Sequence, residues 1–125
     1  AFHPHITAGD GSPGGGNIIQ YVVKTLVGLI DWKLDIQAAI DLPNIGAQTS
    51  ATTELEKGTV LSTLQPGLAE RGHTVVVVDI NSGLQGIVFN GRRGKTPAPF
   101  AKAPGKGTWA GDADPRREGT AQGTK

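Results

Sequence analysis

The feature that most restricts the fold is a run of apolar residues that starts after Asn17 and repeats with helical spacing. Its members occupy more than one position per turn, so they cover more than one face of a helix: Ile18, Ile19, Tyr21, Val22, Val23, Leu26, Val27, Leu29 and Ile30. We therefore predict a buried helix over residues 15–30. A helix of this kind needs cover from other elements on two sides.

Two shorter helices are expected after it. Residues 34–42 predict an amphipathic helix that ends before Pro43, because the residue before a proline avoids the helical region. A third helix is predicted over residues 59–70 with Thr59 as its N-cap. Pro66 lies inside that segment, so we expect a kink or a late start.

Strands are expected in four places. Residues 73–80 contain four consecutive valines and form the clearest strand. Asn81-Ser82-Gly83 predicts a turn, after which residues 84–90 return as a second strand to give a hairpin. Residues 52–57 and 109–113 are also predicted as strands, whereas residues 1–16 hold five glycines and two prolines and are predicted as a loop.

Length and composition limit the class of protein. The 125 residues correspond to one domain, since domains commonly have about 100–200 residues. Glycine and proline contribute 19 and 8 residues, so turns and loops take up much of the chain. The sequence contains no cysteine, which excludes disulfides, thiol catalysis and thiolate metal sites. It also lacks an apolar run of about 18 residues, so no membrane span is predicted.

Charge divides the sequence into two parts. Residues 1–90 carry four Lys and Arg against eight Asp and Glu, a net charge of −4, whereas residues 91–125 carry eight against three, a net charge of +5. We predict a compact core over 1–90, with the Gly-rich loop, helices and β-hairpin, followed by a basic Gly/Pro-rich segment over 91–125. The two parts form one domain, which we expect to be a fragment.

The most distinctive chemical feature is the glycine-rich stretch GDGSPGGGN at residues 9–17, which leads directly into the first predicted helix. Consecutive glycines let backbone N–H groups converge without obstruction by Cβ atoms, and a helix start adds free N–H groups and a positive dipole end. Such a stretch suits an anion, either a bound phosphate or the oxyanion of acyl transfer. The alternative is a flexible loop in which the glycines only make turns.

Two nucleotide-binding patterns fit this stretch poorly. Gly9, Gly11 and Gly14 satisfy G-x-G-x-x-G, but no strand is predicted before them and no acidic residue ends a second strand. The P-loop pattern requires Gly-Lys-Ser/Thr where this sequence has Gly16-Asn17-Ile18. Nucleotide binding therefore stays an alternative and is not the preferred interpretation.

Gly11-Ser12-Pro13-Gly14-Gly15, followed by an Ile-Ile-x-x-Val-Val helix, resembles the small subunit of the gamma-glutamyltransferase (glutathione hydrolase) family. Further stretches resemble that subunit in the same order: IQAAIDLPN at 36–44, TELEKG at 53–58, RGH at 71–73 and GDADPRREG at 111–119. The similarity extends over nearly the whole chain, and the order of the stretches makes it specific.

The resemblance implies the fold and the chemistry of the N-terminal-nucleophile hydrolases. Their fold is a four-layer αββα sandwich, of which this α+β chain, with helices packed on mainly antiparallel strands, would form a part. In the family a precursor cleaves itself and exposes a Thr, which attacks the gamma-glutamyl amide with its own amine as base. The two glycines of the family's Pro-Gly-Gly segment supply oxyanion-hole N–H groups, which assigns that role to Gly14 and Gly15. Ser12, Pro13 and Gly16 are then predicted to line the substrate site.

The sequence also departs from the family. It begins with Ala1, its Thr7 is internal, and the residues that hold the substrate's α-amino and α-carboxylate groups are absent. Position 44 is Asn, where many members carry Arg and a bacterial subset carries Asn. We therefore expect the C-terminal part of a small subunit. Alone it should be inactive, with the large subunit and the N-terminal part of the small subunit as partners.

Other candidate residues have simpler explanations. His3 and His5 have no further ligands beside them in the sequence, so no metal site is predicted, and no cofactor is implied. His73 is expected to be structural, and the DPRRE sequence at 114–118 is expected to form ion pairs and a turn. The basic residues of 92–106 lack a regular element that would organise them, so nucleic-acid binding is not predicted. The aspartates around the second helix are expected to cap it or to face solvent: Asp31, Asp35 and Asp41.

These observations favour gamma-glutamyl transfer and hydrolysis of glutathione and related amides by an assembled enzyme. Two alternatives stay open. The chain is either a non-catalytic fragment that binds partners without turnover, or an anion- or nucleotide-binding module that uses the Gly-rich loop. The resemblance implies a periplasmic or secreted location.

Overall fold

A computed structural model describes residues 8–47, 51–90 and 108–122 of the chain. The elements are, in chain order, β1 (Ala8–Gly11), the 3₁₀ helix η1 (Gly15–Asn17), α1 (Ile18–Ile30), α2 (Ile36–Asp41), β2 (Ile45–Gly46), β3 (Thr52–Glu56), the 3₁₀ helix η2 (Val60–Leu64), α3 (Gln65–Ala69), β4 (Thr74–Val78), β5 (Gln85–Asn90) and β6 (Thr108–Ala113).

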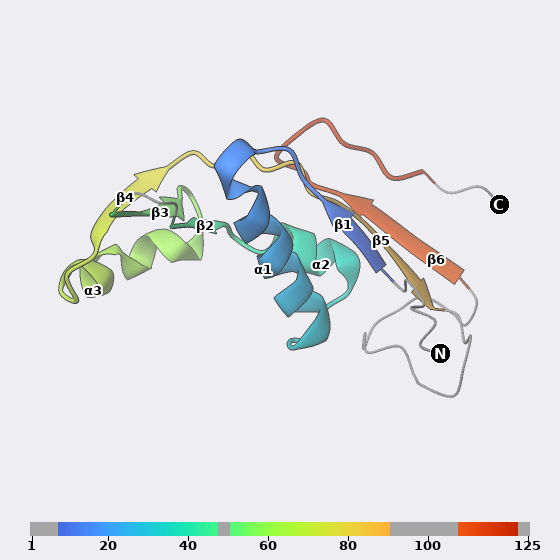
Figure 1. The fold of residues 1–125 in the computed structure, drawn as a ribbon, viewed down its shortest axis with the longest axis horizontal. Coiled ribbons are helices and arrows are strands. Elements are labelled where there is room, and N and C mark those ends of the chain that lie inside the picture. Colours follow the sequence, from blue (N-terminus) through green and yellow to red (C-terminus); the bar gives the residue numbers. More distant parts are fainter. Residues whose placement is uncertain (1–7, 48–50, 91–107, 123–125) are drawn as a thin grey trace.

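The strands form two three-stranded sheets, one at each end of the molecule (Figure 1). In the sheet β1-β5-β6 both pairs are antiparallel, whereas in β2-β3-β4 the first pair is antiparallel and the second parallel. Helices α1 and α2 pack together, with α1 beside β1 and α2 over β5 and β6, while α3 packs on β4. The predicted α+β class with mainly antiparallel strands is confirmed.

The hydrophobic core lies between the two longer helices and the sheet β1-β5-β6. Gly86 of β5 allows the closest approach, because a Cβ atom there would lie 2.5 Å from the Ile36 side chain of α2. Each large aliphatic side chain buried in this way stabilises the fold by about 1.5–3 kcal/mol. The buried residues of this core are Tyr21, Leu29, Ile36, Ala39, Ile40, Ile80, Leu84 and Val88.

Helices α1 and α2 confirm the two helices that the spacing of apolar residues predicts. The predicted helix over 15–30 is present as η1 followed by α1. The side chain of Asp35 accepts a hydrogen bond from the N–H of Ala38 at 2.8 Å and so caps α2, which ends before Pro43. Lys24 of α1 donates to the carbonyls of Ile40 and Leu42, and its positive charge therefore complements the C-terminal end of the α2 dipole.

The third predicted helix is split in two. Thr59 caps it as predicted, because its hydroxyl accepts a hydrogen bond from the N–H of Leu61. The first part is the 3₁₀ helix η2, and α3 starts only at Gln65 with Pro66 in its first turn. A proline has no N–H to donate, so it is tolerated in a first turn and not further along. The predicted strands at 52–57 and 109–113 are present as β3 and β6.

The predicted hairpin over 73–90 is wrong. β4 pairs in parallel with β3, whereas β5 pairs with β1 and β6 in the other sheet. Residues 81–83 do not reverse the chain but form part of a linker between the two sheets. Parallel pairing requires a crossover between the strands, and η2 with α3 provides it.

The predicted loop over residues 1–16 is wrong in part, because residues 8–11 form β1. Ala8 and Asp10 face the helices, and Gly9 and Gly11 are exposed on the outer side of the sheet. Pairing with β5 supplies the hydrogen bonds that the glycine-rich sequence does not predict. Residues 91–107 of the predicted basic Gly/Pro-rich segment lie outside the described residues, as do the histidines at positions 3 and 5. The division at residue 90 stays a prediction, and β5 and β6 pair across it.

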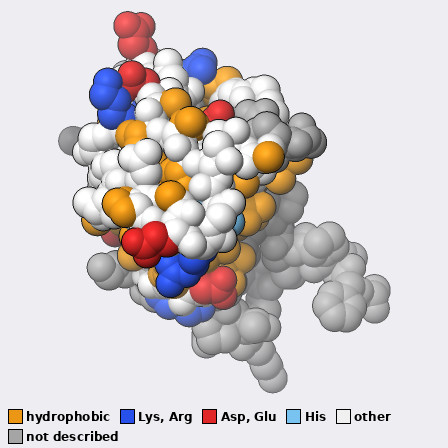
Figure 2. Space-filling view, turned by 90° about the vertical axis from the view of Figure 1, so that its left-hand side faces the viewer, with side chains coloured by type: hydrophobic (Ala, Val, Ile, Leu, Met, Phe, Trp, Pro, Cys, Tyr) orange, Lys and Arg blue, Asp and Glu red, His pale blue; other side chains and the backbone are white. Residues whose placement is uncertain are grey.

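Helix α1 presents an apolar stripe to solvent. Ile19, Val23, Leu26 and Ile30 are spaced by four, three and four residues, so they lie on one face, and they are 73%, 51%, 37% and 43% exposed. Figure 2 shows the end of the molecule that carries β2-β3-β4 and α3, where apolar side chains lie as separate spots among polar ones. Among the described residues no helix is both long and apolar enough to cross a bilayer.

We expect the 125-residue chain by itself to bind a hydrophobic dye or to self-associate through this stripe. The variant Ile19→Lys should lower dye binding and shift the chain toward monomer in sedimentation, with little change in Tm, because Ile19 makes few contacts. Val60→Lys is the matched control, since Val60 is 70% exposed but lies in η2. A monomeric wild-type chain with a sharp melting transition and no dye binding would contradict the prediction.

Candidate functional site

The glycine-rich stretch forms a tight connection between β1 and α1. Gly14 and Gly15 have φ angles of +144° and +58°, a region that favours glycine. A Cβ atom on Gly14 would lie 2.7 Å from the Tyr21 ring, whereas a Cβ atom on Gly15 would meet nothing within 4 Å. Gly14 is therefore required both by its backbone angles and by packing, and Gly15 by its angles.

The N–H groups of these two glycines are open. No described group accepts a hydrogen bond from either of them, whereas their carbonyls accept the N–H groups of Asn17 and Ile18. Helix α1, which follows at once, has no acidic residue in its first turn, so its positive end is not neutralised there. The turn therefore carries two backbone donors without a described acceptor, directly before the positive end of the α1 dipole.

The neighbouring predicted site residues take different positions. The Ser12 hydroxyl donates to the carbonyl of Pro13 at 2.7 Å and accepts from the N–H of Gly83 at 3.2 Å. The Pro13 ring packs against Gly83, and Gly16 is exposed within η1. Substrate contact by Ser12, Pro13 or Gly16 stays a prediction, as does the role of Gly14 and Gly15.

Asp10 is a buried carboxyl group that the sequence did not single out. It lies on the helix-facing side of β1, and both its oxygens are buried without a hydrogen-bond partner among the described residues. Burial raises the pKa of Asp10 from 3.8 to about 6, and the dipole of the Gly11 N–H and the charge of Lys24 offset this only in part. Burial also lowers the pKa of Lys24 to about 8, and the positive charge of Arg116 acts in the same direction.

The DPRRE sequence at 114–118 builds a buried network around Asp114, whose side chain is 1% exposed. One Asp114 oxygen accepts from the Ser82 hydroxyl at 2.5 Å and the Leu84 N–H at 3.2 Å, and the other accepts from the backbone and guanidinium of Arg116. Burial alone would raise the pKa of Asp114, but these hydrogen bonds outweigh it and hold the pKa below its ordinary value. The predicted structural role of this sequence agrees with these contacts.

Arg116 connects this network to the other sheet. Its guanidinium binds both carboxylate oxygens of Glu56, at the end of β3. Glu56 also accepts the N–H of Asn44 at 2.6 Å, and the Asn44 amide donates to Ser82 at 2.9 Å. Asn44 thus closes a ring of contacts between Glu56 and Ser82, and its side-chain oxygen Oδ1 has no hydrogen-bond partner among the described residues.

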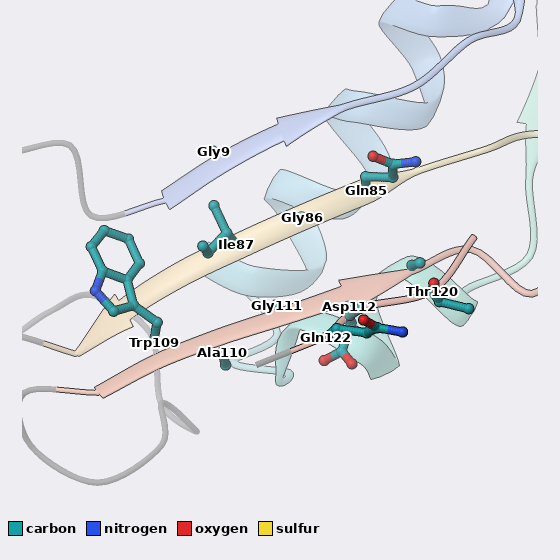
Figure 3. Close-up of a pocket in the computed structure, with 12 residues that line it drawn as sticks. Gly9, Gln85, Gly86, Ile87, Trp109, Ala110, Gly111, Asp112, Thr120 and Gln122 are labelled. Atoms are coloured by element: carbon teal, nitrogen blue, oxygen red, sulfur yellow. The ribbon is translucent and has the colours of Figure 1, made fainter. Parts of the chain in front are cut away.

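A pocket of about 700 Å³ lies along β5 and β6 and is bounded by β1 and residues 120–122 (Figure 3). The large apolar side chains among its lining residues are Ile87 and Trp109, which are 45% and 60% exposed. Asp112 is the one titratable side chain among its lining residues, so the pocket holds no acid–base pair. The described residues also bring no three His, Cys, Asp or Glu side chains close enough to hold a metal ion.

The gamma-glutamyltranspeptidase family profile matches residues 4–124, which is nearly the whole chain. This chain belongs to that family. The resemblance drawn from the ordered sequence stretches is therefore confirmed. No curated protein sequence matches the chain.

Solved structures of gamma-glutamyltranspeptidases share the fold. A mutant of the Helicobacter pylori enzyme is 23% identical, with a TM-score of 0.71 over 89% of this chain and 54% of that one. The Pseudomonas nitroreducens enzyme complexed with L-DON is 17% identical, with a TM-score of 0.75 over 100% of this chain and 59% of that one. The Bacillus anthracis transpeptidase CapD is 21% identical, with a TM-score of 0.70 over 94% and 63%. This chain thus covers between 54% and 63% of the length of these three structures.

Asp10 predicts an unusual dependence of stability on pH. Its folded-state pKa of about 6 exceeds the ordinary 3.8, so the folded state holds the proton more tightly. Ionisation of the carboxyl group therefore destabilises the fold, and this cost is absent at pH 4 and below and grows as pH rises from about 4 to about 6. We expect Asp10→Asn to raise the Tm at pH 8 and to change it little at pH 4.

Thermal melts of the 125-residue chain at several pH values test this expectation. Asp79→Asn is the control, because the Asp79 side chain is 87% exposed and its pairing with Lys57 lies at the surface. The same Tm difference between wild type and Asp10→Asn at pH 4 and at pH 8 would contradict a buried, unpaired carboxyl group.

Proposed function

We propose that this chain is part of an enzyme that transfers or hydrolyses the gamma-glutamyl group of glutathione and related amides. In this proposal the chain supplies the oxyanion-hole loop, and Gly14 and Gly15 are its backbone donors. The observation that carries the proposal is the pair of open N–H groups at the start of α1, within the Ser-Pro-Gly-Gly stretch that resembles the family.

The chemistry requires an anion site of this kind. When a nucleophile attacks the gamma-glutamyl carbonyl, its oxygen becomes negatively charged, and donors aimed at that oxygen stabilise the transition state more than the substrate. Backbone N–H groups suit this role because they are fixed by the fold and do not reorganise during the reaction. The positive end of the α1 dipole adds to their effect.

The other groups of the reaction lie outside this chain in the proposal. A Thr at the start of the small subunit would form the acyl-enzyme intermediate, and its own amine would take the proton from the hydroxyl group. Water would then release glutamate, or the amine of an acceptor would receive the acyl group. The large subunit and the N-terminal part of the small subunit are the proposed partners, in a periplasmic or secreted enzyme.

One rival function uses the same geometry. Open N–H groups at a helix start also suit a phosphate group, so the chain would then be an anion- or nucleotide-binding module. Titration of the 125-residue chain with inorganic phosphate or ATP separates the two. Saturable binding that Gly15→Val abolishes would favour this rival, whereas the enzyme proposal expects none at millimolar concentration.

The 125-residue chain by itself should release no chromophore from a gamma-glutamyl anilide. An oxyanion hole without a nucleophile retains about 10³-fold acceleration over water in enzymes that keep their substrate pocket, but here the substrate-holding residues are also missing. The assay compares the purified chain with buffer and with heat-denatured chain. Turnover above both controls would contradict the proposal that the nucleophile and the substrate-holding residues lie outside this chain.

In the assembled enzyme, Gly15→Val should turn the N–H of residue 15 away from the oxyanion, because valine disfavours the φ of +58° found there. Loss of one oxyanion donor costs about 2.7–4 kcal/mol of transition-state stabilisation, so kcat should fall by roughly 10²–10³-fold. Gly58→Val is a closely matched control. Gly58 also has a positive φ, +75°, and open space around its Cβ position, but it lies after β3 in the other sheet. The two variants therefore carry similar backbone strain at different places.

Processing of both variants must first be checked on a denaturing gel, since self-cleavage uses the same nucleophile. The proposal expects fully processed Gly58→Val enzyme to keep its kcat. Fully processed Gly15→Val enzyme with near-normal kcat would remove the oxyanion role and leave the loop as a structural turn.

A further inference from the structure

The peptide between Pro13 and Gly14 has a carbonyl oxygen that accepts a hydrogen bond and an N–H that has no described acceptor. A peptide unit is planar, so its carbonyl oxygen and its N–H point in fixed, opposite directions. The Pro13 oxygen is held at 2.7 Å by the Ser12 hydroxyl, and the N–H at the other end of the same plane is the open Gly14 donor. Whatever fixes the Pro13 oxygen therefore fixes the direction of the Gly14 N–H.

The direction of the Ser12 hydroxyl is itself determined from outside the turn. A hydroxyl has one hydrogen to donate and two lone pairs that accept. The N–H of Gly83 occupies a lone pair of Ser12 Oγ at 3.2 Å, which leaves the hydrogen for the Pro13 oxygen. Without Gly83 the hydroxyl would rotate more freely, and the peptide plane would lose its anchor.

Gly83 is held on both sides by the buried Asp114 carboxylate. Ser82 donates to this carboxylate through its hydroxyl at 2.5 Å, and Leu84 donates through its N–H at 3.2 Å. The absence of a side chain on Gly83 is needed as well, because a Cβ atom would lie 2.8 Å from Pro13 Cγ and 2.8 Å from Arg117 Cδ. The linker thus contacts the Pro13 ring directly while it donates to Ser12.

We propose that Ser12 is a positioning residue, which holds the Pro13–Gly14 peptide so that the Gly14 N–H is aimed before substrate arrives. Gly83, fixed by Asp114, is the support that orients the Ser12 hydroxyl. The part of this inference that concerns catalysis rests on the proposed function, and the part that concerns the orientation of the peptide does not. Ser12 touches no reacting atom in this role.

Two measurements on the assembled protein test the two parts separately. Amide hydrogen exchange of a peptide covering residues 9–17, followed by mass spectrometry, reports the order of the turn. Steady-state kinetics with a gamma-glutamyl anilide reports kcat and KM. Ser12→Ala removes the hydroxyl, and Ser12→Thr keeps it. Thr63→Ala is the control, because it removes an exposed hydroxyl that also donates to a nearby carbonyl but lies in η2, between β3 and β4.

We expect Ser12→Ala to speed exchange in residues 9–17 and to lower kcat by roughly ten- to a hundredfold, because the Gly14 donor is loosened and not removed. KM should stay within about twofold, since an oxyanion donor acts mainly in the transition state. Ser12→Thr should restore both values to near wild type, and Thr63→Ala should change neither.

Unchanged exchange in Ser12→Ala would overturn the proposed anchoring, whatever the kinetics show. Faster exchange with unchanged kcat would overturn the catalytic part. If the wild-type assembly has no gamma-glutamyl turnover, the proposed function fails, and the exchange measurement still decides the anchoring. If Ser12→Ala does not fold, Gly83→Ala, which displaces Pro13, must speed exchange in the same peptide for the proposal to stand.

Discussion

The Arg116 guanidinium is the interaction on which the rest of the structure depends, because it joins the two sheets to the end of α2. It pairs with Glu56 at the end of β3 and with Asp114 after β6, and it donates to carbonyls at the C-terminal end of α2: those of Ile40, Asp41 and Leu42. The side chains of Arg116 and Glu56 are 15% and 10% exposed. Removal of one partner from a buried pair of this kind costs about 3–5 kcal/mol, because the other charge is left without compensation.

Around this centre the chain builds two layers, one of helices and one of strands. Helices α1 and α2 cover one face of β1-β5-β6, while Ile87, Trp109 and the exposed glycines of β1 and β6 occupy the other face. In the αββα sandwich of N-terminal-nucleophile hydrolases a second sheet lies on such a face. Glycines without side chains permit a second layer to approach closely, and Trp109, which stacks on Phe89 at 4.5 Å between ring centroids, provides an apolar surface for it.

The sequence predicted what depends on local patterns and missed what depends on distant contacts. Periodicity gave α1 and α2, and the capping residue Asp35 and the position of Pro66 agree with the observed helix ends. Residues 81–83 have turn composition, yet they link the two sheets, and Asp114, about thirty residues later, accepts hydrogen bonds from Ser82 and Leu84. Strand β1 was missed because its hydrogen bonds come from β5, and the burial of Asp10 follows from that pairing. The run of glycines predicted backbone donors in this turn, but the contact that requires a glycine at position 14, with the Tyr21 ring, depends on tertiary packing.

A turn rich in glycine has more conformations to lose on folding than any other sequence, so its order must be stabilised by contacts from elsewhere. Here those contacts come through Asp114, which holds both neighbours of Gly83 and also pairs with Arg116. One carboxylate therefore contributes both to the junction of the two sheets and to the direction of the Gly14 N–H. A substitution of Asp114 would change stability and turn geometry together and could not separate them. Ser12 lies at the end of the same chain of contacts and outside the buried ion pair, so a change there alters the turn while the junction stays intact.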